Sequence, residues 1–182
     1  PMGTGMLITP YGSELHTLIE GGTGTESMLE EQPSGAPERL ESGTQNMPGI
    51  AGLRAGMEFV QKHGVSKIHS YEISLLQMLY SQLSKIDRVH LYLPMPDTRY
   101  FAPVLSFNID GMQSEEVGSR LNGYGIALRA GLHCAPEAHR FMGTLECGAV
   151  RVCPSVFTTE ADIWRLVDAV KRILMKKSGA GH

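Results

Sequence analysis

The chain has 182 residues, which is enough for one domain or for one domain and part of another. Its 16 basic and 19 acidic residues give a net charge of −3, with no basic tract of the kind that binds nucleic acid. No apolar run approaches the ~20 residues of a membrane-spanning helix, and a hydrophobic content of 42% argues against disorder. We therefore expect a folded chain that binds neither nucleic acid nor membrane.

The N-terminal region combines a short apolar run with a long polar loop. Residues 6–8 are apolar and are followed by Pro10 and Gly12, a pattern that predicts a short strand ended by a turn. Residues 20–46 are rich in glycine, serine and threonine, and loops of this length are usually functional or part of an interface. Their amides and hydroxyls could bind a phosphate, although most glycine-rich loops are only loops.

The rest of the chain alternates helical and strand-like patterns. Asn46 is a candidate N-cap for a helix that Gly64 would end, and a second helix is predicted from Ser66. Further helices are predicted over 114–122 and from Thr158 or Thr159, and a helical turn is predicted within 131–147. Strands are predicted over 89–93, 104–109, 126–129 and 149–152. This order predicts an α+β fold, with a short antiparallel or mixed sheet flanked by helices.

The densest group of reactive side chains surrounds Cys134, which follows a predicted strand and precedes Pro136, a good first residue for a helix. Arg129 and His133 would add positive potential, which favours the thiolate form of a cysteine. These features describe an accessible nucleophile. The alternative is that Cys134 is a small buried hydrophobic residue, and local spacing does not decide between the two.

Arg151 lies within an apolar strand-like run just after Gly148. A guanidinium in that position could face a cleft and bind a carboxylate through two hydrogen bonds. A structural salt bridge explains it equally simply, and without further context it is the preferred interpretation.

No metal site or disulfide scaffold is expected. The three cysteines form no C-x-x-C pair, and the spacing of the cysteines and histidines between 133 and 153 matches no standard zinc module. A reducing, cytoplasmic location is the expectation for such a chain.

Five segments, in chain order, are Gly3–Gly5, Gly21–Gly24, Arg39–Asn46 with Pro48–Ile50, Arg129–Ala135 and Gly148–Arg151. Together they resemble the C-terminal half of a cysteine desulfurase of the Suf-like type. This family belongs to the class V aminotransferases, which are fold type I pyridoxal-phosphate (PLP) enzymes with an α/β parent fold. The resemblance implies that residues 1–64 are a remnant of the large PLP-binding domain, with a strand, an interface loop and a helix. Residues 65–182 would be the small C-terminal domain.

The resemblance also implies roles for matching residues. Cys134 would attack the sulfur of the substrate L-cysteine and carry the persulfide to a sulfur-acceptor protein. Arg151 would hold the substrate carboxylate, with Arg129 as a second binding residue and His133 in support. Thr44, together with Gly21 and Gly22, would contact the PLP phosphate of the other subunit in a homodimer.

One family feature has no match. The Schiff-base lysine of the family precedes the Gly-x-Gly turn, where this chain begins, and the first of its six lysines is Lys62. The resemblance therefore implies a parent enzyme that binds PLP and a chain that, alone, neither binds PLP nor turns over cysteine. Selenocysteine lyase or another class V activity remains an alternative, as does a non-catalytic, self-associating α+β module.

Overall fold

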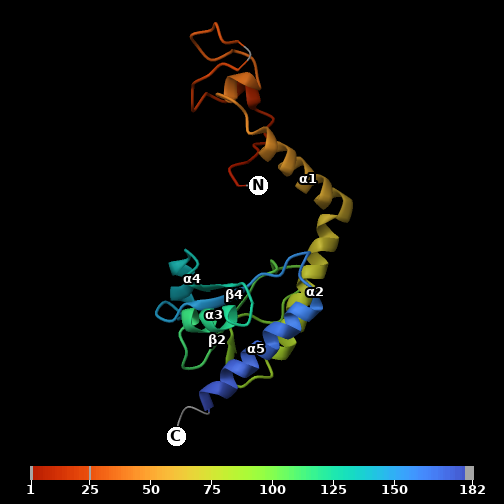
Figure 1. Cartoon of the computed structure of the whole chain (residues 1–182), viewed down its shortest axis with the longest axis vertical. Coiled ribbons are helices and arrows are strands. Elements are labelled where there is room, and N and C mark those ends of the chain that lie inside the picture. Colours follow the sequence, from red (N-terminus) through yellow and green to blue (C-terminus); the bar gives the residue numbers. More distant parts are fainter. Residues whose placement is uncertain (1, 25, 179–182) are drawn as a thin grey trace. The chain divides into compact units, whose positions relative to one another are not determined.

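The computed structural model describes residues 2–24 and 26–178. The chain divides into two compact units, Pro1–His63 and Gly64–His182, and each is described here by itself (Figure 1). Among the described residues, no helix is long and apolar enough to cross a membrane.

The first unit contains two short 3-10 helices, η1 (Gly12–Glu14) and η2 (Glu38–Leu40), and one long helix, α1 (Met47–His63). The strand predicted over residues 6–8 is absent from the structure, so that prediction was wrong. Leu7 and Ile8 are 75% and 81% exposed. A strand needs a neighbour to accept its backbone hydrogen bonds, and an apolar run without one stays irregular.

Helix α1 begins and ends as its sequence predicts. The Asn46 side-chain oxygen accepts a hydrogen bond from the backbone N–H of Gly49 at 3.0 Å, which is the N-cap geometry. Gly64 has φ +83°, a left-handed conformation that glycine adopts without steric cost and that ends the helix. The next helix, α2 (Val65–Leu83), starts directly after it.

The second unit is built on a four-stranded sheet with every neighbouring pair antiparallel, in the order β1-β2-β4-β3. The α+β prediction is confirmed. The strands are β1 (Val89–Leu91), β2 (Leu105–Ile109), β3 (Arg129–Gly131) and β4 (Ala149–Val152). The remaining helices are α3 (Ser114–Asn122), α4 (Pro136–Phe141) and α5 (Glu160–Ser178).

Strand β3 starts three residues later than the sequence predicts. The backbone N–H of Ile126 donates to the carbonyl of Leu121 at 3.2 Å, and Gly125 has φ +74°. These residues therefore close the end of helix α3, and the chain joins the sheet only at Arg129.

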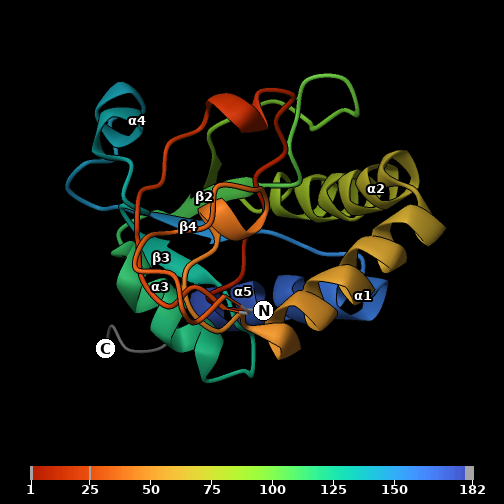
Figure 2. The ribbon, with the colours of Figure 1, turned by 90° about the horizontal axis from the view of Figure 1, so that it is seen from above.

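One face of the sheet is apolar and packs against helices. Helices α2 and α3 both contact α5, and α2 and α5 lie side by side in both ribbon views (Figures 1 and 2). Leu105, Phe107 and Ile109 of β2 are fully buried in the core that these helices share with the sheet. Because successive strand residues point to opposite faces, the residues between them point to the other side.

That other side is called here the polar face of the sheet, and it is defined by Ser106 and Asn108 of β2, Arg129 of β3 and Arg151 of β4. The register pairs Arg151 with Ser106 on one side and with Arg129 on the other. The polar face therefore carries a row of hydrogen-bonding side chains that lie far apart in the sequence and are brought together by strand pairing.

Candidate active site

The Cys134 loop joins the end of β3 to the start of α4. Cys134 is exposed, and Pro136 is the first residue of α4, as the sequence predicts. Exposure excludes the alternative of a buried hydrophobic cysteine. His133 and Cys134 have φ +54° and +58°, and they are the two non-glycine residues with positive φ that the structure records in its described part. Each left-handed L-residue costs about 1–2 kcal/mol, so the loop stores strain beside the thiol.

Two hydrogen bonds hold this strained loop. The backbone N–H of Ala135 donates to the Leu132 carbonyl at 2.9 Å, which closes a turn around His133 and Cys134. The Nε2 atom of His133 lies 2.9 Å from the carbonyl oxygen of Ala149 on β4. A carbonyl only accepts hydrogen bonds, so the proton is on Nε2.

Two glycines allow β3 and β4 to approach closely at the start of the loop. Gly131 and Gly148 have φ +107° and +61°. A Cβ atom on Gly148 would lie 2.9 Å from the Cα of Gly131 and 2.5 Å from the Ser114 hydroxyl oxygen. A larger residue would therefore push the Cys134 loop away from the sheet.

Two arginines lie on neighbouring strands of the polar face. Arg129 and Arg151 are direct cross-strand partners. In the described part of the chain no carboxylate forms an ion pair with Arg151, and its buried Nε atom has no hydrogen-bond partner. The preference for a structural salt bridge at Arg151 was therefore wrong. Like charges in direct cross-strand contact are unfavourable, and an anion between them would relieve the repulsion.

The imidazole of His133 stays neutral beside these arginines. Burial lowers its pKa below the ordinary value of 6.5, and the positive charges of Arg151 and Arg129, with His139, lower it further. The hydrogen bond to Ala149 opposes this shift. The centroids of the His133 and His139 rings are 5.8 Å apart, and Nδ1 of the buried His139 is 2.7 Å from the Thr144 hydroxyl oxygen.

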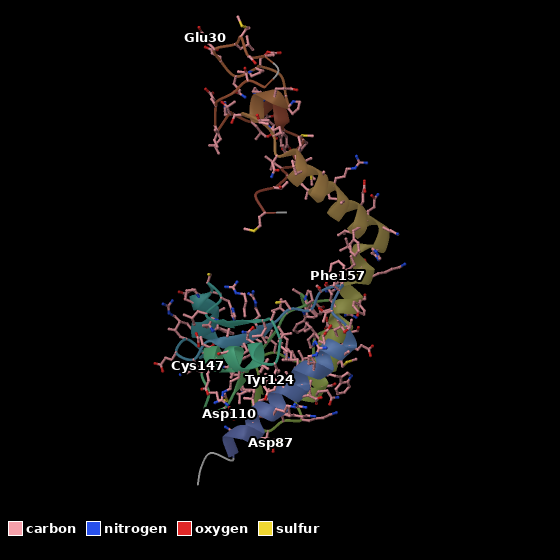
Figure 3. The ribbon with its side chains drawn as sticks, viewed as in Figure 1. Glu30, Asp87, Asp110, Tyr124, Cys147 and Phe157 are labelled. Carbon is pink, nitrogen blue, oxygen red and sulfur yellow. The ribbon has the colours of Figure 1, made fainter. Side chains whose placement is uncertain are left out.

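The predicted phosphate contacts lie in the first unit. Gly21, Gly22 and Thr44 line a hollow of about 460 Å³, where the backbone N–H of Gly43 donates to the Gly22 carbonyl at 2.8 Å. The exposed residues Gly22 and Thr44 offer an amide and a hydroxyl that fit a phosphate group, whereas the Gly21 amide donates to the side-chain oxygen of Gln32 at 3.4 Å. Glutamates line the same hollow and would oppose an anion; they are Glu20, Glu30 (labelled in Figure 3) and Glu31.

Sequence reasoning missed the polar residues of strand β2. The amide of Asn108 donates to the Gly148 carbonyl at 2.9 Å and lies 3.3 Å from the Cys147 sulfur. A cavity of about 400 Å³ opens beside them and is lined in part by Asp110 and Cys147, which are labelled in Figure 3. Burial raises the pKa of Tyr92 in this cavity, and the charges of Cys147 and Asp110 raise it further. The only signal for this group was the alternation of polar and apolar residues in 104–109. Among the described residues, no cluster of metal-ligating side chains is found.

Comparison with known families decides the relationship of the chain. The aminotransferase class-V model matches residues 1–166. The chain belongs to the class-V aminotransferase family. The matching region covers the glycine-rich loop, the Cys134 loop and strand β4, so all the residues discussed above fall within it.

Curated relatives of this class-V chain include cysteine desulfurases of Yersinia pestis (strain Pestoides F) and Yersinia pseudotuberculosis (serotype O:1b). Each is 37% identical over 138 residues, which is 76% of this chain and 32% of the relative. The resemblance to cysteine desulfurases inferred from the motifs is thereby confirmed. The chain spans about a third of the length of the curated relatives that it matches.

Solved structures of cysteine desulfurases also match the chain. An apo cysteine desulfurase from Thermococcus onnurineus NA1 matches with a TM-score of 0.69 and 28% identity, over 77% of this chain and 34% of that one. The cysteine desulfurase CsdA (S-sulfonic acid) from Escherichia coli matches with a TM-score of 0.66 and 30% identity, over 77% and 33% of the two chains.

Proposed function

We propose that this chain is the part of a PLP-dependent cysteine desulfurase that carries the nucleophilic thiol and the substrate-binding arginines. Residues 1–64 would belong to the large PLP-binding domain, and residues 65–182 would form the small C-terminal domain. One observation carries the proposal: the exposed Cys134 lies in a strained loop, and its neighbour His133 is hydrogen-bonded to the strand that bears the unpaired Arg151.

The substrate would be bound by its carboxylate. Arg151 offers a guanidinium with no competing carboxylate in the described residues, and Arg129 adds a second positive charge across the strand pair. A bidentate arginine–carboxylate contact fixes the orientation of a small amino acid as well as binding it. This contact would present the substrate sulfur to the Cys134 loop.

The thiol of Cys134 would then accept the sulfur. Its sulfur atom attacks the sulfur of L-cysteine, an S–S bond forms, and the Cβ–S bond of the substrate breaks with its electron pair left on carbon. Protonation of that carbon gives L-alanine, and the two thiol hydrogens together supply the new C–H bond and the persulfide proton. The transferred sulfur is oxidised and the carbon is reduced, so no external oxidant is needed.

The cofactor would supply the electron sink for this step when bound. Thr44, Gly21 and Gly22 would contact its phosphate across a homodimer interface, which their exposed amides and hydroxyl permit. The lysine for a covalent link would come from elsewhere in the parent protein, since none of the six lysines of this chain precedes Lys62. The isolated chain is therefore expected to be inactive.

The persulfide would be passed to a sulfur-acceptor protein. Cys134 is exposed, so a second thiol can reach it. All three cysteines are free, which suits the reducing conditions of the cytoplasm, where we place the protein.

The test is alanine release from L-cysteine by the full-length protein that carries this chain. Cys134→Ala is expected to abolish it, whereas Cys153→Ala, which removes another exposed thiol, leaves it unchanged. Full alanine release by Cys134→Ala would refute the proposed sulfur transfer. Selenide release from selenocysteine that survives in Cys134→Ala would instead favour selenocysteine lyase.

A further inference from the structure

The Cys134 loop has one side-chain hydrogen bond to the sheet, and it comes from the residue beside the thiol. His133 Nε2 contacts the Ala149 carbonyl at 2.9 Å. Ala149 lies two residues before Arg151 on the same strand, so the contact ties the loop to the backbone that presents the guanidinium. Resting on the proposed function, we infer that His133 is a positioning residue, whose Nε2–H fixes the Cys134 thiol relative to Arg151.

The backbone geometry explains why the loop requires such a contact. His133 and Cys134 both adopt left-handed φ values, which L-residues do not keep unless the surroundings impose them. The Ala135–Leu132 hydrogen bond closes the turn locally but does not connect it to the sheet. The His133 ring makes that connection, and it does so from a residue directly adjacent to the thiol.

The protonation state of the ring matches this role. With the proton on Nε2, a neutral ring leaves Nδ1 as a bare nitrogen, and that atom is buried with no hydrogen-bond partner. A second proton would place an N–H there without an acceptor, next to Arg151, Arg129 and His139. The lowered pKa of His133 is consistent with a ring that stays neutral and keeps its single donor directed at Ala149.

The His133–Ala149 contact should affect the rate of sulfur transfer more than the binding of the substrate. Arg151 is fixed by its own strand, whereas the thiol depends on the loop. Because displacement of a reacting atom by about 1 Å can cost up to 10²-fold in rate, loss of the tether should slow sulfur transfer. It should leave the affinity for the substrate carboxylate unchanged.

The experiment measures single-turnover persulfide formation on Cys134 in the full-length protein that carries this chain. His133→Ala is expected to slow it by about tenfold or more, with the KM for cysteine unchanged. His133→Gln, whose side-chain amide can donate from a similar position, should restore most of the rate. His90→Ala, which removes an exposed histidine of strand β1, is the matched control and should match the wild type.

Each outcome separates this inference from the proposed function. Persulfide formation at the wild-type rate in His133→Ala, or a slow rate that His133→Gln does not restore, overturns the positioning role and leaves the proposed function intact. If the wild type forms no persulfide, the proposed function fails. Hydrogen exchange then tests separately whether the His133–Ala149 hydrogen bond holds the Cys134 loop to the sheet. Faster exchange of the amides of residues 132–135 in His133→Ala, but not in His133→Gln, supports it, and unchanged exchange overturns it.

Discussion

The two units of the chain bury very different amounts of apolar side chain. Among the described residues of the first unit only Pro33 and Gly49 are buried, and Leu18 and Met28 are 96% and 95% exposed. The second unit encloses a continuous core between its sheet and helices α2, α3 and α5. The second unit therefore has its own source of stability, whereas the first is held by helix caps and turn hydrogen bonds.

The exposed apolar side chains of the first unit have a further consequence. Exposed apolar side chains can promote association between molecules, which would favour the self-associating module considered from the sequence. The catalytic proposal rests instead on the polar face of the sheet in the second unit.

The largest expected effect comes from truncating one apolar side chain in each unit and comparing the losses of stability. Leu79 is fully buried in the second unit, so Leu79→Ala should lower the free energy of unfolding by about 2–5 kcal/mol. Leu7 is 75% exposed in the first unit, so Leu7→Ala should change it by less than about 0.5 kcal/mol. Urea denaturation followed by the fluorescence of Trp164, the one tryptophan, measures the effect of Leu79→Ala in the second unit, and hydrogen exchange of the first unit's amides measures the effect of Leu7→Ala. Equal effects would contradict the contrast between the units.

The next effect tests the close approach of β3 and β4 under the Cys134 loop. Gly148→Ala should lower the free energy of unfolding by about 1–3 kcal/mol more than Gly125→Ala. Both glycines have positive φ, but a Cβ on Gly148 meets backbone and side-chain atoms, while one on Gly125 meets no atom within 4 Å. The difference between the two variants therefore isolates the crowding. Identical denaturation midpoints would show that the strands can separate without cost.

A smaller effect concerns the first unit. Asn46→Ala should destabilise helix α1 by about 0.5–2 kcal/mol because the N-cap hydrogen bond to Gly49 is lost. Asn46→Ser, which keeps a capping oxygen, should behave almost as the wild type. Hydrogen exchange of α1 amides measures the change, and the denaturation midpoint reported by Trp164 should not move. A shift of that midpoint would mean that the two units unfold together.

The smallest effect is a pH dependence. The pKa of His133 is lowered in the folded protein, so below about 6.5 the unfolded chain binds more protons than the folded one. The stabilising contribution is therefore complete above pH 6.5 and is lost as the pH falls toward the lower pKa of the folded state. In thermal denaturation between pH 5 and 8, the melting temperature should rise less steeply with pH for His133→Gln than for the wild type. Equal slopes would contradict a partly buried imidazole that stays neutral in the folded protein.

The fold was largely predictable from the sequence because its signals are local. The Asn46 cap, the stop at Gly64 and the strand ending at Ile109 each depend on residues close together in sequence, and all three are confirmed. The strand predicted over 6–8 failed because strand formation depends on a partner that local pattern does not reveal. Strand β3 started late because the end of α3 took up the preceding residues.

The candidate site was less predictable, because its key relations join distant residues. Proximity in sequence brought Arg129, His133 and Cys134 together, but the pairing of Arg129 with Arg151 depends on strand register. The contact of His133 with Ala149, sixteen residues away, depends on the loop conformation. The left-handed backbone at His133 and Cys134 had no signal in the sequence, since neither residue is a glycine or an asparagine.

The central claim is that Cys134 receives the sulfur of the substrate. The most direct measurement is mass spectrometry of the peptide containing Cys134, after the full-length protein that carries this chain has been incubated with L-cysteine and trapped with an alkylating agent. We predict the added mass of one sulfur atom on Cys134 and none on Cys147 or Cys153. Alanine release with no added sulfur on Cys134, or with the sulfur on another cysteine, would contradict the account.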